Sequence, residues 1–298
     1  MTRALVIGGA SLLGHYLVLE GVRSGREVIS AYRESMPKVE GQRVKLDITD
    51  ARATLALLRS LGPKEVYLPA AMTNVDQCER EPSLAMRINA EGTRNVAQAC
   101  AETKAKLLYV STDYIFNGLS QTPYGETDKP EPISAYSRSK LEGERATLEA
   151  SSDNLVCRVC VLYGWNRAAK KNNFVTWIID SLRSGKEIKL LKDQWVSPTY
   201  APHAAGVMVE LMSQGREGVY HTTGPECLSR HEIGMKVAEV FDLDRSLIKI
   251  GRREEMRFDA QRPDRSCLDV DKVQKAIGRN MLTLREGLLD MRRTEGTT

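Results

Sequence analysis

The sequence predicts an α/β protein built on a doubly wound parallel sheet, for two reasons. Short β-branched runs alternate with longer amphipathic stretches through the first half of the 298-residue chain, and strands that alternate with helices indicate parallel β-α-β units. Runs such as LVIG and LLYV are apolar on both faces, as strands covered by helices on both sides must be. Right-handed crossovers between such strands give the doubly wound arrangement.

The alternation assigns the elements of the first half in order. Strands are expected at residues 4–8, 27–32, 43–47, 64–70, 106–111 and 154–159. Helices are expected at residues 11–25, near 50–60, at 82–103 and at 136–150. Since ligands of such sheets bind beyond the carboxyl ends of the strands, the residues directly after each strand are the candidates for function.

The rhythm changes after about residue 165. The expected elements there are helices near 173–184, 203–213 and 229–241, a strand EIKLL, a strand near 218–222 and two short C-terminal helices. We therefore expect residues 1–165 to form the parallel-sheet core, to which the strand near 218–222 returns. Residues 166–298 should form mainly a smaller substrate-binding lobe that makes a cleft with the core.

Composition excludes several functional classes. The net charge of +4 comes from 43 basic and 39 acidic residues spread along the chain, whereas a nucleic-acid-binding protein concentrates its basic residues in a patch. No run approaches the roughly eighteen apolar residues of a membrane span. The histidines form no constellation with ligand spacing, so no metal site is expected.

The six cysteines indicate a reduced, cytoplasmic protein. They are spread over a long chain without the spacing of a disulfide framework. Cys157 and Cys160 form a CxxC, but they lie in an apolar run that reads as a buried strand, where residues three apart face opposite sides. All six cysteines are therefore expected to be free thiols.

A glycine-rich turn follows the first strand directly. Residues 8–14, GGASLLG, have the spacing Gly-x-x-Ser-x-x-Gly. Glycine allows a sharp turn and a close approach to a pyrophosphate, and the following helix offers its N-terminal amides. Ser11, in the place of a middle glycine, fits as the helix N-cap. The predicted cofactor-binding residues here are Gly8, Ser11, Leu12, Leu13 and Gly14.

The end of the second strand favours NADP over NAD, which stays the alternative cofactor. NAD sites usually place a carboxylate there for the ribose 2′-hydroxyl, whereas an arginine accommodates a 2′-phosphate. This chain has Ala31-Tyr32-Arg33 at that point. Arg33 is therefore a candidate clamp for the 2′-phosphate. Asp47 and Ile48, after the third strand, are expected at the adenine edge.

Tyr136 and Lys140 lie four residues apart at the start of a predicted helix, so they share one face. An ammonium near a phenol favours phenolate and should lower the pKa of Tyr136. Tyrosine could then give a proton to a carbonyl oxygen as hydride arrives. The preceding strand ends in Ser111-Thr112, whose hydroxyls could hold the same carbonyl.

These motifs together resemble an extended short-chain dehydrogenase/reductase. The series STDYIFNG (111–118), PYGETDKPEP, AYSRSKLEGE, NNF (172–174), DQWVSPTYA (193–201) and QRPDRSCLD (261–269) more closely resembles the dTDP-4-dehydrorhamnose reductase family. The resemblance covers nearly the whole chain. It implies a Rossmann core and reduction of a 4-keto-6-deoxy nucleotide sugar by NADPH.

The resemblance also assigns residues to roles. Thr112, Tyr136 and Lys140 match the catalytic positions of the family. Further cofactor contacts are implied at Ala70, Ala71, Thr73 and Asn89, as well as at Tyr136 and Lys140. Substrate contacts are implied at Thr112, Phe116, Asn173, Phe174 and Arg262.

The chain also departs from the family pattern. Val161 stands where a sugar-stacking tryptophan is common, and His203 where an acidic residue is frequent, so the identity of the sugar stays open. Two alternatives remain. One is a regulatory NADP-binding protein similar to the β subunit of methionine adenosyltransferase. The other is a nucleotide-sugar epimerase or dehydratase. Assembly as a homodimer is left open.

Overall fold

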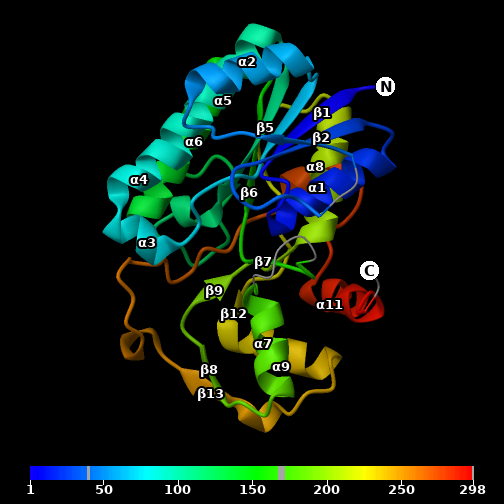
Figure 1. Ribbon diagram of the computed structural model, residues 1–298. Coiled ribbons are helices and arrows are strands. Elements are labelled where there is room, and N and C mark those ends of the chain that lie inside the picture. The colour runs from blue at the N-terminus through cyan, green and yellow to red at the C-terminus, as the bar shows by residue number, and fades with distance from the viewer. Residues whose placement is uncertain (39–40, 167–171, 297–298) are drawn as a thin grey trace.

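The computed structural model describes residues 1–38, 41–166 and 172–296, and it confirms the doubly wound α/β fold (Figure 1). The central sheet has seven strands in the order β11-β6-β5-β4-β1-β2-β3, and every neighbouring pair is parallel. The strands are β1 (Arg3–Ile7), β2 (Glu27–Tyr32), β3 (Gln42–Lys45), β4 (Glu65–Leu68), β5 (Lys106–Thr112), β6 (Leu155–Val159) and β11 (Gly218–His221).

Helices cover both faces of this sheet, as its doubly apolar strands require. On one face pack α1 (Leu12–Arg23), α8 (Ala201–Ser213) and α10 (Asp271–Ile277). On the other lie α2 (Ala51–Leu61), α5 (Gly92–Thr103) and α6 (Ala135–Ala150). Figure 1 shows α2, α5 and α6 to the left of the sheet and α1 and α8 to its right. The strand order reverses between β1 and β4, which places a crevice at the carboxyl ends of these strands.

The predicted single helix at 82–103 is broken into pieces. The structure has α4 (Pro82–Met86), a π-helical turn (Arg87–Glu91) and then α5, and a further short helix, α3 (Val75–Arg80), precedes them. A π-turn widens the helix locally and is frequent at functional sites. Here it carries Asn89, whose side chain bonds to the loop that follows β4.

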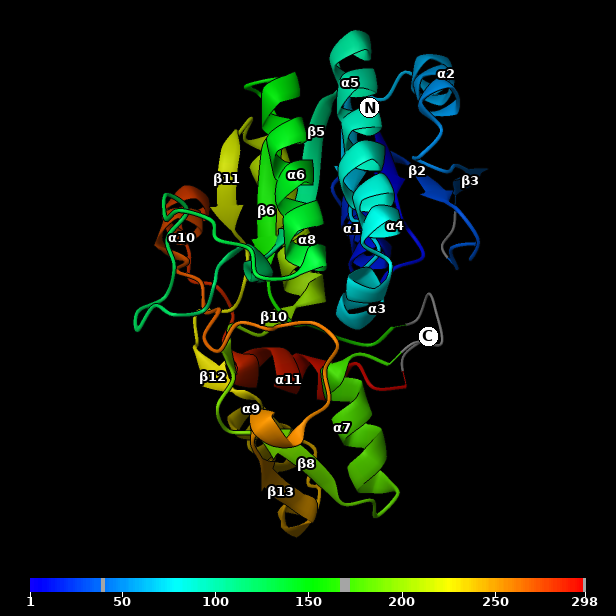
Figure 2. The ribbon, with the colours of Figure 1, turned by 90° about the vertical axis from the view of Figure 1, so that its left-hand side faces the viewer.

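The second half of the chain builds a smaller lobe below the sheet and also contributes β11, α8 and α10 to the core (Figure 2). The lobe has its own buried apolar cluster, which includes Ile178, Ile233 and Leu288. Its elements are α7 (Phe174–Arg183), α9 (Arg230–Val240), α11 (Leu284–Arg293) and a parallel pair of β8 (Ile188–Leu191) and β13 (Ile248–Gly251).

Short strands and turns connect the core with this lobe. β7 (Leu162–Tyr163) pairs with β10 (Thr199–Tyr200), and β9 (Trp195–Val196) pairs with β12 (Leu228–Ser229). Single 3₁₀ turns occupy residues 113–115, 245–247 and 253–255.

The prediction of six free cysteines is wrong for one pair. Cys227 and Cys267 form a disulfide, with their Cα atoms 5.3 Å apart across a sequence separation of 40 residues. Their spacing gave no signal because the fold, and not the local sequence, returns the second segment beside the first. Cys157 and Cys160 are free and buried, as expected.

Candidate active site

The turn between β1 and α1 has the geometry of an anion-binding turn, and glycine is required at two of its positions. Gly8 has a φ of +102°, which is accessible mainly to glycine. A Cβ on Gly14 would lie 2.1 Å from the carbonyl oxygen of Gly8. Ser11 caps α1, because its hydroxyl accepts the Gly14 amide at 3.1 Å, which confirms the predicted N-cap.

A cavity of about 470 Å³ opens beside this turn, at the carboxyl edge of the sheet. Twelve of its lining residues come from or closely follow β1, β2 and β3: Ile7, Gly8, Ala10, Ser11, Ala31, Tyr32, Arg33, Glu34, Ser35, Leu46, Asp47 and Ile48. The loop after β4 adds Pro69, Ala70, Ala71, Met72 and Thr73. Predicted cofactor residues outside this lining are Leu12, Leu13, Gly14, Asn89, Tyr136 and Lys140.

Arg33 and Asp47 lie on the same wall of the cavity. The Arg33 guanidinium is half exposed and pairs with Glu34 at 2.8 Å, so it can turn toward a ligand at little cost. Asp47 accepts the amide and hydroxyl of Thr49 at 2.9 and 2.8 Å. These hydrogen bonds, with a smaller contribution from Arg33, lower the pKa of Asp47. The wall therefore carries one fixed anion and one mobile cation.

Sequence reasoning missed the far side of the cavity. Gln77, Leu84 and Ile88 line it from α3, α4 and the π-turn. Leu84 and Ile88 are spaced four residues apart, so their shared face could have been found. The sequence did not indicate that the face carrying Leu84 and Ile88 closes a cavity, because a single unbroken helix was expected over residues 82–103.

Asn89 belongs to the support of the site. Its side-chain oxygen accepts a hydrogen bond from the Met72 backbone amide at 2.8 Å. Its side-chain nitrogen donates to the Met72 carbonyl and to the Ser139 hydroxyl, both at 3.0 Å. The side chain is 1% exposed. Asn89 therefore ties the loop after β4 to α6, the helix that carries Tyr136 and Lys140.

The three predicted catalytic residues come from β5 and α6. Thr112 is the last residue of β5. Tyr136 and Lys140 lie in the first turns of α6, which a reciprocal capping box of Ser134 and Ser137 starts. The Thr112 hydroxyl bonds to the Asp113 carboxylate at 3.0 Å.

The pKa of Tyr136 does not follow the expectation from the sequence. Burial raises it above its usual range, and a hydrogen bond with Thr112 offsets this only in part. The Lys140 ammonium donates to the Val110 carbonyl at 2.7 Å and lies 4.0 Å from the ring centre of Tyr109. Burial also lowers the pKa of Lys140 to about 7. The predicted fall in the tyrosine pKa is therefore wrong, because desolvation dominates both groups.

Phe116 and Arg262 have partners within the protein. Phe116 is fully buried and stacks on Tyr124 with ring centres 4.2 Å apart. Arg262 donates to the Asp76 carboxylate at 2.8 Å and lies over the ring of Phe258. A ligand that used Arg262 would have to share it with Asp76.

Asn173 and Phe174 form the start of α7. Asn173 caps this helix and donates to the Gly164 carbonyl at 2.7 Å. Phe174 stacks on Trp177, and the Arg230 guanidinium lies 4.8 Å from its ring centre. None of the predicted substrate residues lines the cavity beside the glycine turn.

Val161, at the position of the expected aromatic, has an unusual backbone. Its φ is +36°, which is rare for a β-branched residue and costs free energy. Its carbonyl accepts the amide of Thr199 at 3.2 Å, next to the β7–β10 pair. His203, the other departure, lies in α8, and burial lowers its pKa.

In residues 1–38, 41–166 and 172–296, no helix is long and apolar enough to cross a bilayer. Within the same ranges, no three His, Cys, Asp or Glu side chains are grouped as metal ligands.

Comparison with known proteins gives relatives along the whole chain. The chain is 32% identical over 286 residues to the probable low-salt glycan biosynthesis reductase Agl14 of Haloferax volcanii, covering 96% of this chain and 95% of that protein. It is also 32% identical to the methionine adenosyltransferase 2 subunit beta of Xenopus tropicalis, covering 92% and 82%.

A solved structure agrees with these relatives. The dTDP-4-dehydrorhamnose reductase of Bacillus anthracis in complex with NADP superimposes with a TM-score of 0.88 at 30% identity, over 98% of this chain and 99% of that one. The family model described as the RmlD substrate binding domain matches residues 2–295. The chain therefore belongs to the RmlD substrate-binding domain family, and the resemblance to dTDP-4-dehydrorhamnose reductases is confirmed.

Proposed function

We propose that this protein is an NADPH-dependent reductase of a 4-keto-6-deoxy nucleotide sugar. One observation carries the proposal: the glycine turn, Arg33 and Asp47 line a single cavity at the carboxyl edge of the sheet. The relatives named as reductases, one of them complexed with NADP, support the same chemistry.

The residues present fit a dinucleotide. The absence of a Cβ at Gly8 and Gly14 lets the turn close tightly, so the first amides of α1 can face a pyrophosphate. Arg33 would hold a 2′-phosphate, and Asp47 with Ile48 would border the adenosine. When bound, the nicotinamide supplies the hydride.

Tyr136 would be the proton donor, and its raised pKa makes it a weaker acid than a free phenol, so the transfer needs positive charge nearby. Because burial disfavours the phenolate, the free protein keeps the phenol protonated at neutral pH. A phenol can give its proton to the C4 oxygen as negative charge develops there. Thr112 would orient that oxygen once its hydroxyl proton, which bonds to Asp113 in the structure, turns toward it. Lys140 would supply positive charge close to the reacting groups, because the negative charge of the bound cofactor phosphates would raise the lysine pKa.

The test uses purified full-length protein, NADPH and a panel of 4-keto nucleotide sugars, with nicotinamide absorbance as the readout. Consumption of NADPH with a C4-reduced product supports the proposal. Tyr136→Phe should lower kcat by about 100-fold or more, with little change in NADPH affinity. Product formation without net consumption of NADPH would select an epimerase, and normal turnover by Tyr136→Phe would refute the proton assignment.

A second candidate is a regulatory subunit, favoured by the 32% identity to a methionine adenosyltransferase 2 subunit beta. The presence of Thr112, Tyr136 and Lys140 does not distinguish a reductase from a regulatory subunit. NADPH binding without turnover of any sugar in the panel, together with a change in the kinetics of a methionine adenosyltransferase on mixing, would select this reading.

A further inference from the structure

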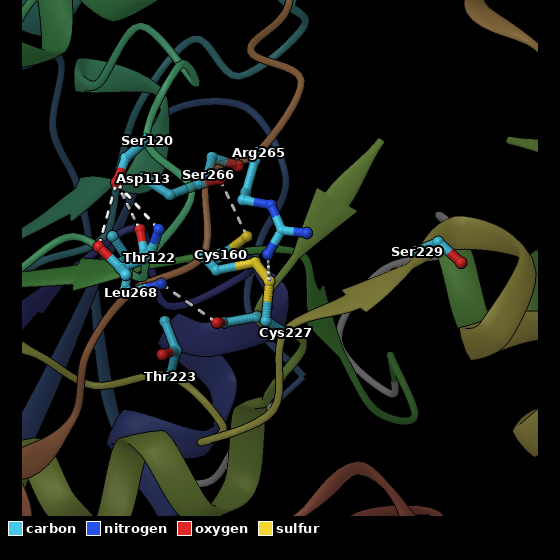
Figure 3. The surroundings of a disulfide bond; sticks show 12 residues. Asp113, Ser120, Thr122, Cys160, Thr223, Cys227, Ser229, Arg265, Ser266 and Leu268 are labelled. Carbon is cyan, nitrogen blue, oxygen red and sulfur yellow. Dashed lines mark hydrogen bonds between the residues drawn. A yellow bond between two sulfur atoms is a disulfide. The ribbon is translucent and has the colours of Figure 1, made fainter. Parts of the chain in front are cut away.

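Asp113 and Ser266 lie in the surroundings of the Cys227–Cys267 disulfide (Figure 3). These two polar side chains connect the bond to the predicted catalytic threonine, Thr112. Ser266 precedes the disulfide-bonded Cys267 in the chain. Its hydroxyl donates to the Asp113 carboxylate, and the Thr112 hydroxyl bonds to the other oxygen of the same carboxylate at 3.0 Å. The path therefore runs from the disulfide through Ser266 and Asp113 to Thr112.

Asp113 is in the right place to fix the orientation of Thr112. It is 3% exposed, and the thiol of Cys160 also bonds to its carboxylate at 2.9 Å. Burial raises the pKa of Asp113, so a carboxyl here needs these partners to stay in place. A threonine hydroxyl has one proton, and its direction depends on the neighbour that shares it.

The disulfide restrains the segment that carries Ser266. Cys267 is fully buried, and its carbonyl accepts the amide of Tyr124 at 2.8 Å. The bond to Cys227 joins this segment to the loop before α9, across 40 residues of chain. Such a cross-link limits how far the two segments can move apart.

Cys227 is the more accessible of the two bonded cysteines. Cys227 is only half-buried, and the Arg265 guanidinium lies 3.5 Å from its sulfur, where positive charge favours a thiolate. The four remaining cysteines are free and buried. Among the six cysteines, a dithiol can therefore reduce this pair alone.

We propose that Asp113 is a positioning residue for Thr112 and that the Cys227–Cys267 disulfide, through Ser266, makes turnover sensitive to thiol–disulfide exchange. The effect on turnover rests on the proposed reductase function. The effect on the position of Thr112 does not, and it can be measured without substrate.

The exchange balances with a dithiol as the reductant. One dithiol thiolate attacks the sulfur of Cys227 and breaks its bond to Cys267, which leaves as a thiolate and takes up a proton. The second dithiol sulfur, as thiolate, then attacks the mixed disulfide and frees Cys227, which takes up the other proton. Two electrons pass to the protein, and the dithiol becomes a cyclic disulfide.

The first experiment compares oxidised protein with protein reduced by dithiothreitol, with thiol labelling and mass spectrometry to confirm the bond state. The amide of Tyr114 donates to the Thr112 hydroxyl at 3.2 Å, so its hydrogen exchange reports the position of Thr112. The amide of Leu107, which lies in β5 with Thr112, donates to the Asn154 side chain and serves as the control. Reduction should speed exchange at Tyr114 more than at Leu107.

The second experiment measures turnover. Reduction should lower kcat about tenfold, since misplacement of a reacting group by a fraction of 1 Å is enough for this, while NADPH affinity stays unchanged. Ser266→Ala and Asp113→Ala should lower kcat in both redox states. Ser266→Thr, which keeps the hydroxyl, should restore most of it. The variant Cys227→Ser/Cys267→Ser should match the reduced protein and ignore dithiothreitol.

Each outcome decides one part. Equal exchange at Tyr114 in oxidised and reduced protein, with the bond state confirmed, would overturn the proposal. So would a kcat that changes by less than about twofold on reduction in an active enzyme. If no sugar turns over but Tyr114 exchange still depends on the bond, the proposed function fails and the connection to Thr112 stands. If the double variant does not fold, the reductant comparison on the unmodified protein still decides.

Discussion

Replacement of Lys140 by methionine should stabilise the folded protein at neutral pH while it removes activity. Lys140 is 2% exposed, and burial lowers its pKa from 10.5 to about 7, with Glu144 opposing this in part. At pH below 7 the folded state holds an ammonium in a desolvated place. Methionine has a similar length and no charge, so it avoids this cost.

The magnitude follows from the pKa. A fall from 10.5 to about 7 corresponds to a cost on the order of 5 kcal/mol for the charged form. Methionine loses the 2.7 Å bond to the Val110 carbonyl, and an acceptor without its partner costs about 1–3 kcal/mol. Lys140→Met should therefore be more stable by about 2–4 kcal/mol at acidic to neutral pH.

The pH dependence has a defined sign. Between pH 7 and 10.5 the unfolded protein binds the Lys140 proton more tightly than the folded protein does. The free energy of unfolding of the unmodified protein should rise with pH in this window because of Lys140. The advantage of Lys140→Met should shrink in the same window, reach zero within it and reverse near its upper end, where only the lost hydrogen bond to Val110 remains.

Urea unfolding at a series of pH values measures this directly, with the exposed Lys186→Met as the matched control. Turnover is followed on the same samples. The reasoning about desolvation would be refuted if Lys140→Met were less stable than the unmodified protein at pH 7. It would also be refuted if the stability difference between the two proteins did not change with pH.

Three further predictions concern the cofactor site and the segment beside it. Gly14→Ala should weaken NADPH binding and cost about 1–3 kcal/mol of stability, because the new methyl would lie 2.1 Å from the Gly8 carbonyl oxygen. Dinucleotide titration measures the binding and urea unfolding measures the stability. Unchanged binding would count against the role of the turn. Arg33→Ala should weaken NADPH about tenfold more than NADH by loss of a charged hydrogen bond, as fluorescence titration measures; equal losses would exclude the 2′-phosphate clamp. Asp76→Ala should cost about 1 kcal/mol, because Asp76 pairs with Arg262 at 2.8 Å. Since Arg262 holds the pKa of Asp76 low, that difference should fade only in acid, as the pH falls through the folded pKa; a difference that persists unchanged in acid would contradict the pairing.

The parallel sheet and the cofactor turn could be predicted because their signals are local. The apolar strands, the glycine spacing and the N-cap at Ser11 each depend on residues that are close together in the sequence. Arg33 and Asp47 could be placed on one wall because each directly follows a strand of the same sheet. The structure confirms that both line the cavity.

What could not be predicted depends on contacts between distant segments. The pairing of Cys227 with Cys267 follows from the path of the chain through the smaller lobe. Arg262 looked free in the sequence, but Asp76 lies 186 residues away and binds it. The break at Asn89 reflects hydrogen bonds to the loop after β4, which no periodicity records.

The pKa values of Tyr136 and Lys140 have one common cause, and this bears on the direction of the reaction. Burial raises the first and lowers the second, so near neutral pH Tyr136 is a phenol and Lys140, one turn further along α6, is close to its midpoint. A phenol is the form needed to protonate a carbonyl oxygen, whereas the reverse oxidation needs phenolate. In the proposed reductase, Tyr136 would therefore already hold the proton that reduction consumes. Cofactor phosphates would add negative charge, which raises the lysine pKa again and supplies the cation that stabilises the phenolate left after proton transfer.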